Sequence, residues 1–156
     1  MRAGDTIVAV ATAMGESAVG LIRVSGRDAL ATAEPLIRAA EPLADFPSHR
    51  LRRVTVIDPR TGDRLDEALC AVMRAPRSYT GEDVVELSCH GSPALLRIVT
   101  ELLIAAGARL AEPGEFTRRA FLNGRMDLAQ AEAVALMIRA RTERAVALAA
   151  RAMAGG

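Results

Sequence analysis

The sequence contains no tryptophan and no lysine, and aromatic residues make up only 3% of its 156 residues. Aliphatic side chains must therefore fill the hydrophobic core, and the 51% of residues that are hydrophobic are enough for a sizeable one. All 20 basic residues are arginine, whose planar guanidinium binds carboxylates and phosphates through paired hydrogen bonds. The 19 acidic residues leave a formal net charge of +1, which excludes a strong overall field for nucleic acid.

Cysteine is also scarce. The two cysteines, Cys70 and Cys89, do not make a disulfide framework, and their apolar surroundings predict two buried free thiols. No signal peptide is visible, and no apolar run is long enough to span a membrane. We therefore expect a soluble cytoplasmic protein. The length fits one domain, or one domain with an appendage.

The chain alternates between β-branched runs and helical patterns, which predicts an α+β fold. Ser25 and Asp28 form a potential capping box for a helix that Pro35 should kink or divide. We predict an amphipathic helix over residues 93–106 and one long Ala-rich helix over residues 128–153 that needs another helix as its partner. Strands are predicted over residues 5–12, 19–25, 51–57, 65–73, 84–87 and 108–112.

A short helix and a tight corner are predicted between the last strand and the Ala-rich run. Pro113 can occupy a first helical turn, and Asn123-Gly124 suits a left-handed helix end. Asp127 followed by Gln130 indicates a capping box for the next helix. Such a corner can hold Arg125 in one place, although an ordinary connection with solvated arginines has the same pattern.

Several catalytic and metal sites are excluded or weakly supported. Gly15 and Gly20 have the spacing of a phosphate loop, but Leu21-Ile22 stands where Lys-Ser/Thr should follow, so a Walker A site is rejected. Cys89-His90 offers two metal ligands, fewer than zinc requires. No nucleophile elbow surrounds a serine near His90. The sequence therefore predicts no catalytic residues and no metal site.

Charged residues inside two predicted strands are the strongest candidates for binding. Glu86 lies in an apolar run before a Gly-containing turn, where a carboxylate can accept two parallel hydrogen bonds from the amino-imino edge of guanine or pterin. Arg23 interrupts another apolar run and should point to the opposite face from its neighbours. Arg23, Glu86 and Arg125 would suit a ligand with such a ring and carboxylates. The alternatives are a strand carboxylate paired with a neighbouring arginine, and a solvent-facing Arg23.

Dense blocks of this sequence resemble the MnmE (TrmE) family of tRNA modification GTPases. The blocks run in order along nearly the whole chain: residues 5–9, 20–26, 79–83, 86–87, 90–91, 113–116, 119–124 and 127–133. The resemblance implies an α+β mixed sheet with packed helices, similar to the tetrahydrofolate-binding domains of aminomethyltransferases. Residues 1–122 would form the folate-binding and dimerisation domain, and residues 123–156 the beginning of a helical domain.

The family's folate-contacting residues fall on Arg23, Glu86 and Arg125, with 5-formyl-tetrahydrofolate as the implied cofactor. Relatives often have Lys at the position of Arg125, so the contact keeps its positive charge but its hydrogen-bond geometry would differ from theirs. The loop at residues 13–17 also lacks the Pro and Arg often seen in relatives. The resemblance further implies a homodimer, a flavoprotein partner MnmG (GidA), and modification of the wobble uridine of tRNA.

GTP, magnesium and potassium would belong to a G domain whose motifs do not occur in these 156 residues, so we expect this chain not to hydrolyse GTP. Two alternatives stay open. One is a stand-alone one-carbon transfer enzyme of the aminomethyltransferase type, and the other is a purely structural dimerisation module.

Overall fold

A computed structural model describes residues 4–155 of the chain. It divides into two compact units, each described by itself below. The first unit runs through Ser78 and continues over Glu82–Ala111. The second consists of Tyr79–Gly81 and the chain from Glu112 onward. The functional boundary expected between residues 122 and 123 stays a prediction.

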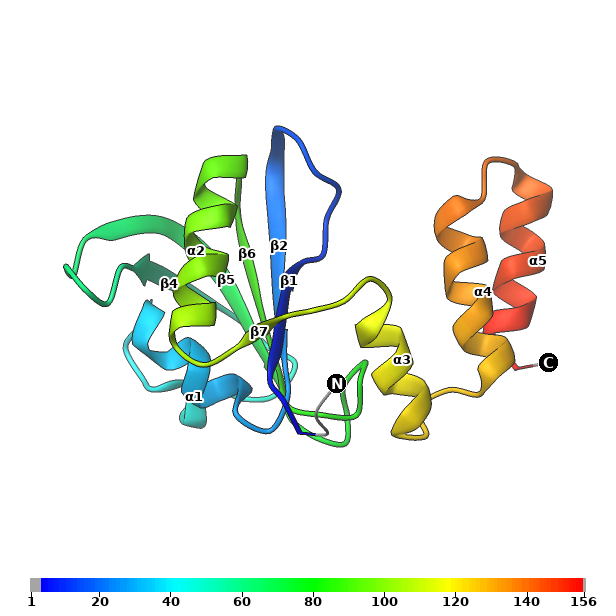
Figure 1. The fold of residues 1–156 in the computed structure, drawn as a ribbon, viewed down its shortest axis with the longest axis horizontal. Helices are drawn as coiled ribbons and strands as arrows, with labels where there is room; N and C mark the ends of the chain where they lie inside the picture. The colour runs from blue at the N-terminus through cyan, green and yellow to red at the C-terminus, as the bar shows by residue number, and fades with distance from the viewer. Residues whose placement is uncertain (1–3, 156) are drawn as a thin grey trace. The chain divides into compact units, whose positions relative to one another are not determined.

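The first unit is built on a curled seven-stranded sheet with the order β3-β4-β5-β6-β2-β1-β7 (Figure 1). Its neighbouring strands are antiparallel except for β7, which pairs with β1 in parallel, so the prediction of a mixed α+β sheet is confirmed. The short strand β3 was not predicted, and β6 extends beyond its predicted end at residue 87. The strands are β1 Ile7–Val10, β2 Ser17–Ser25, β3 Ile37–Arg38, β4 Leu51–Ile57, β5 Arg64–Met73, β6 Val84–Gly91 and β7 Arg109–Leu110.

Two helices cover one face of this sheet. α1 spans Ala29–Ala33 and passes into a 3₁₀ turn, η1, at Glu34–Leu36, so the division predicted at Pro35 is confirmed. α2 spans Pro93–Ala105, and the Ser92 side chain accepts a hydrogen bond from the backbone N–H of Leu95 at its start. A second 3₁₀ turn, η2, lies at Leu43–Asp45.

The capping box predicted at Ser25 is wrong. Ser25 is still part of β2, where it pairs with Val84, and its hydroxyl donates to Oε1 of Glu82 at 3.0 Å. Its hydroxyl therefore bonds a carboxylate beside the neighbouring strand. Asp28 stands at the start of α1 without a side-chain capping bond.

The core lies between the sheet and the two helices, and aliphatic side chains fill it as predicted. Alternate residues of each strand point toward α1 and α2, as the strand period of two requires. On the inner side of the predicted amphipathic helix α2, Leu96, Val99, Leu102 and Leu103 are buried, and Leu95 is partly buried. Fully buried members include Val8, Ile22, Val24, Val56, Cys70, Val72, Val85, Leu87, Val99 and Leu103.

The second unit contains three helices, α3 Glu115–Leu122, α4 Leu128–Arg139 and α5 Glu143–Met153. The prediction of one long Ala-rich helix is wrong. Ala140 is extended, with φ −61° and ψ 130°, and the side chain of Thr142 accepts from the N–H of Ala145 to begin α5. α4 and α5 therefore form an antiparallel hairpin (Figure 1). Each of the two helices covers part of the apolar surface of the other.

The caps of this unit match the sequence in part. The Asp127–Gln130 capping box is confirmed in both directions, and Gly124 has the predicted left-handed backbone, with φ +74°. Pro113 does not lie in the first turn of α3, because Gly114 is the N-cap residue and the helix begins at Glu115.

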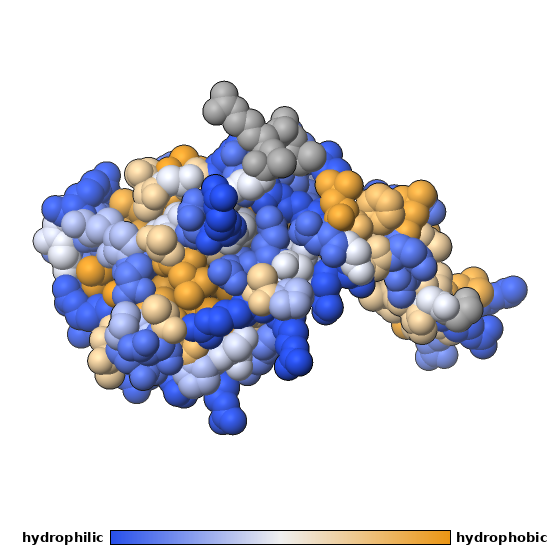
Figure 2. All heavy atoms as spheres, turned by 90° about the horizontal axis from the view of Figure 1, so that it is seen from below, coloured by the Kyte–Doolittle hydropathy of each residue, from blue (hydrophilic) through white to orange (hydrophobic). Residues whose placement is uncertain are grey.

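Apolar side chains also reach the surface of the α4–α5 hairpin (Figure 2). None of the described helices is both long enough and apolar enough to cross a bilayer. The exposed apolar residues of the hairpin are Leu128, Leu136, Ile138, Val146, Leu148 and Met153.

Neighbouring residues of α2 provide a test of the core. Leu103 is 0% exposed and Ile104 is 39% exposed. We expect Leu103→Ala to lower the free energy of unfolding by about 2–5 kcal/mol, because it leaves a cavity. Ile104→Ala should lower it by less than about 1 kcal/mol. Urea unfolding followed by circular dichroism measures both, and equal losses would contradict this packing.

Candidate functional site

Arg23 and Glu86 lie directly opposite each other on neighbouring strands. β2 and β6 are antiparallel, and their register pairs Arg23 with Glu86. Nη2 of Arg23 lies 3.4 Å from Oε2 of Glu86, and the two side chains are 22% and 21% exposed. Two of the three predicted site residues are thus brought together, and the alternative of a strand carboxylate paired with a neighbouring arginine is realised.

This pair lies on the sheet face opposite to α1 and α2. Ile22 and Val24 flank Arg23 in β2, and both are buried in the core. Val85 and Leu87 do the same beside Glu86. Because successive side chains of a strand alternate between faces, both charged groups point away from the core. The prediction that Arg23 points away from its neighbours is confirmed.

Small side chains flank the ion pair on this face. In the same cross-strand row, Ala9 of β1 is opposite Arg23, and Ala71 of β5 is opposite Glu86. An alanine extends only one carbon from the sheet, so neither neighbour rises to the height of the charged side chains. Sequence reasoning missed both alanines, because their place in this row depends on strand register.

The acidic residues of the loop before β6, Glu82 and Asp83, accept hydrogen bonds from neighbouring segments of the chain. Oδ1 of Asp83 accepts from the N–H of Ala75 at 2.8 Å, and the Asp83 carbonyl accepts from the N–H of Gly26. Glu82 accepts from the Ser25 hydroxyl. These carboxylates fix the approach of the chain to β6 and so support the position of Glu86.

Arg125 belongs to the second unit, in the corner between α3 and α4. Its N–H donates to the carbonyl of Ala120 at 2.8 Å, and the N–H of Gly124 donates to the carbonyl of Phe121 at 3.1 Å. These two bonds, with Gly124 left-handed, make a Schellman motif at the end of α3. The predicted corner that fixes the backbone of an arginine is confirmed.

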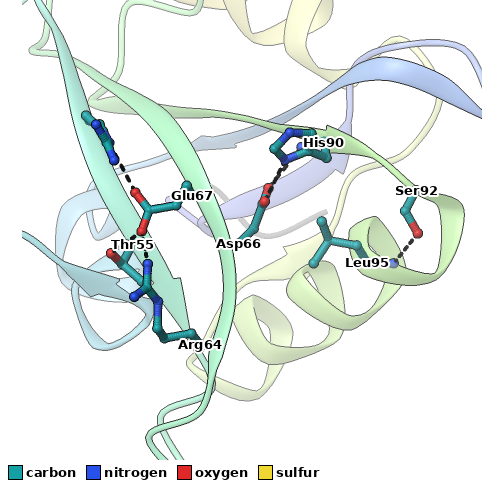
Figure 3. Close-up of polar contacts among 8 residues, drawn as sticks. Thr55, Arg64, Asp66, Glu67, His90, Ser92 and Leu95 are labelled. Atoms are coloured by element: carbon teal, nitrogen blue, oxygen red, sulfur yellow. Dashed lines mark hydrogen bonds and ion pairs between the residues drawn. The ribbon is translucent and has the colours of Figure 1, made fainter.

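His90 is hydrogen-bonded to Asp66 within the first unit. Its Nδ1 lies 2.7 Å from Oδ1 of Asp66, and its backbone N–H donates to Oδ2 of the same carboxylate (Figure 3). Among residues 4–155, no group of three or more His, Cys, Asp or Glu side chains could hold a metal ion. The two hydrogen bonds between Asp66 and His90 join β5 to the end of β6.

Another polar cluster ties β4 to β5. Glu67 accepts from the Thr55 hydroxyl at 3.0 Å and from Nε of Arg53 at 3.2 Å, and it also pairs with Arg64 (Figure 3). The hydrogen bond from Thr55, followed by that from Arg53, holds the pKa of the Glu67 carboxyl below its usual value. The bonds from Thr55 and Arg53 to Glu67 join β4 to β5, which indicates a structural role.

An apolar hollow of about 250 Å³ lies between α2 and the loop after β1. Val10, Met14, Leu96 and Ile104 are among its lining residues. Its charged lining residues, Arg97 and Glu101, pair with each other across one helical turn. It therefore lacks the converging polar groups that a ligand with charged ends requires.

The two cysteines are buried in the core as free thiols, as predicted. Burial raises the pKa of Cys70 and of Cys89 to about 12. A thiol with so high a pKa is a poor nucleophile and a poor metal ligand. Both therefore act as small apolar core residues.

A sequence profile described as "GTP-binding protein TrmE N-terminus" matches residues 6–125, most of the first unit together with the corner that carries Arg125. The chain belongs to the TrmE N-terminal family. Proteins named "tRNA modification GTPase MnmE" are similar to it over nearly its whole length. Those of Symbiobacterium thermophilum and Geobacter sulfurreducens are each 56% identical over 97% and 96% of this chain. That of Geobacillus thermodenitrificans is 50% identical over 97% of it.

The chain spans about a third of the length of these relatives, with 33%, 32% and 33% of each covered. The similarity to these relatives therefore concerns the third of their length that this chain covers. It includes each of the candidate site residues Arg23, Glu86 and Arg125.

The thiols provide a test of this core assignment. At pH 8, four units below a pKa of about 12, about one thiol in 10⁴ is ionised. We expect Cys70 and Cys89 to resist a disulfide reagent in the folded chain and to react fully in denaturant. An added Ala105→Cys, at an exposed position of α2, should react at once. Rapid labelling of either native thiol without unfolding would contradict the assignment.

Proposed function

We propose that this chain is the folate-binding part of a tRNA modification GTPase, with 5-formyl-tetrahydrofolate as the one-carbon donor. Glu86 binds the amino-imino edge of the pterin ring in this proposal. Arg23 and Arg125 bind the polar ring substituents and the glutamate tail. The observation that carries the proposal is the Arg23–Glu86 pair in a family whose members are named tRNA modification GTPases.

The chemistry of the donor set fits this ligand. A carboxylate has about four lone-pair sites, so Glu86 can accept from Arg23 and still accept from a ligand edge. Glu86 makes one contact with Arg23, at 3.4 Å. A ligand edge that donates two parallel hydrogen bonds would therefore bind the Glu86 carboxylate more strongly than Arg23 does. The flanking Ala9 and Ala71 carry no polar side-chain group that would compete with a ligand for Glu86.

Arg125 enters the proposal through the family match, which includes this position. Its guanidinium keeps the positive charge of the lysine that relatives often carry there. Its planar fork suits a carboxylate of the glutamate tail, which it can bind through two parallel hydrogen bonds. The confirmed corner gives this side chain a fixed point of attachment.

The wider assembly is proposed on the same family relation. It comprises a homodimer of this chain, the flavoprotein MnmG (GidA) as partner, and GTP, magnesium and potassium in the rest of the protein. The product is a modified wobble uridine in tRNA, and the location is the cytoplasm. A stand-alone one-carbon transfer enzyme would consume the folate, whereas the proposed module binds it without turnover.

We expect Glu86→Gln to weaken binding of 5-formyl-tetrahydrofolate about ten- to a hundredfold, because a charge-assisted hydrogen bond contributes about 1.5–3 kcal/mol. The change keeps the shape of the side chain and removes its charge and one acceptor. Arg23→Ala should weaken binding over a similar range. Isothermal titration calorimetry of the three folded proteins measures the difference.

Glu101→Gln is the matched control. Glu101 also pairs with an arginine, Arg97, but it lies on α2 with 62% of its side chain exposed. We expect the Glu101→Gln variant to bind the folate with the same affinity as the original sequence. If Glu86→Gln and Arg23→Ala bind as tightly as this control, Glu86 is only a paired strand carboxylate.

The homodimer provides a separate test. We expect a dimer in analytical ultracentrifugation at tens of micromolar chain, a range that satisfies micromolar affinities. Addition of 5-formyl-tetrahydrofolate should leave the dimer intact. A sedimentation coefficient of a monomer throughout this range would count against the proposal.

A further inference from the structure

Three residues from the loop between β5 and β6 belong to the second unit. The chain enters that unit at Tyr79 and leaves it after Gly81. The hydroxyls of Tyr79 and Thr117, on α3, lie 2.7 Å apart. Nδ2 of Asn123 donates to the carbonyl of Thr80 at 2.8 Å. This segment is therefore attached to α3 and to its C-cap residue, at two points about 1.7 turns apart.

Gly81 packs against the stem of Arg125. It has φ +79°, a conformation that favours glycine. A Cβ added there would lie 3.2 Å from Cγ of Arg125 and 3.1 Å from Cβ of Asn123. The glycine backbone thus lies beside the aliphatic part of Arg125, and a Cβ at position 81 would require Arg125 or Asn123 to move by a few tenths of an ångström.

The backbone on both sides of Arg125 is already fixed. The N–H of Arg125 closes the Schellman motif that follows α3, and the capping box at Asp127 begins α4 two residues later. The contact with Gly81 adds a restraint on the side chain of Arg125. An arginine that is ordered before its ligand arrives loses less rotamer entropy on binding.

We propose that Gly81 and Asn123 are positioning residues for Arg125, and that they hold its side chain ready for the carboxylate end of the ligand. Asn123 anchors the Tyr79–Gly81 segment, and Gly81 limits the directions open to the Arg125 stem. The ligand assignment rests on the proposed function. The restriction of Arg125 does not, because it follows from contacts within the second unit.

A double-mutant cycle tests the proposal with 5-formyl-tetrahydrofolate as the probe. The bond from Asn123 has the size of a neutral hydrogen bond, so Asn123→Ala should weaken binding about two- to tenfold. In an Arg125→Ala background the same change should cause no further loss. In an Arg23→Ala background it should cause its full loss, because Arg23 lies in the other unit.

A readout without ligand separates this proposal from the proposed function. NMR relaxation of the Arg125 Nε–Hε group should show a restricted side chain in the original sequence and a more mobile one in Asn123→Ala. Arg139→Ala, an exposed change in the same unit, should leave both the relaxation and the affinity unchanged. If the original sequence does not bind the folate but Arg125 loosens as expected, only the ligand assignment fails.

Two results would overturn the positioning role. One is an equal loss of affinity from Asn123→Ala in the presence and absence of Arg125, which indicates general support of the fold. The other is an Arg125 side chain whose mobility does not change in folded Asn123→Ala. Gly81→Ala gives a second variant with the same expected pattern, and circular dichroism verifies that each variant is folded.

Discussion

The antiparallel pairing of β2 with β6 is the interaction on which the rest of the first unit depends. It joins segments about sixty residues apart in the chain and places Arg23 opposite Glu86. The same register buries Val24 and Val85 beneath the helices. A slip of one residue would turn every side chain of β6 to the other face and bury Glu86 in the core. Core packing and the position of the charged pair are therefore fixed by one set of backbone hydrogen bonds.

This dependence divides the sheet into two faces with different roles. The face toward α1 and α2 holds aliphatic residues and two protonated thiols, and the opposite face holds the charged pair between small neighbours. With so few aromatic residues, core stability comes from many aliphatic contacts, each of modest size. Arg23 and Glu86 lie on paired strands, so the sheet fixes their backbones. The helical unit achieves the same for Arg125 through two caps and the Tyr79–Gly81 segment.

Local signals predicted much of this structure from sequence. The strands β4 and β5, the helix α2, the capping box at Asp127 and the left-handed Gly124 depend on neighbouring residues, and all were found as expected. One failure occurred where a distant partner competes with a local one, because Ser25 bonds Glu82 across the sheet instead of capping α1. The other was a local signal that the prediction overlooked, because Thr142 caps a new helix inside a run of good helix formers. The Arg23–Glu86 partnership, the flanking alanines and the attachment of Tyr79–Gly81 to α3 depend on register and tertiary packing. Spacing along the chain does not encode these contacts.

The central claim is that the Arg23–Glu86 face and Arg125 bind one folate molecule. The most direct test is an NMR titration that follows the arginine Nε–Hε resonances as 5-formyl-tetrahydrofolate is added. The account predicts that Arg23 and Arg125 shift together and saturate at one ligand concentration, while Arg97 on α2 does not move. Saturable binding that leaves the Arg23 resonance unchanged would contradict it.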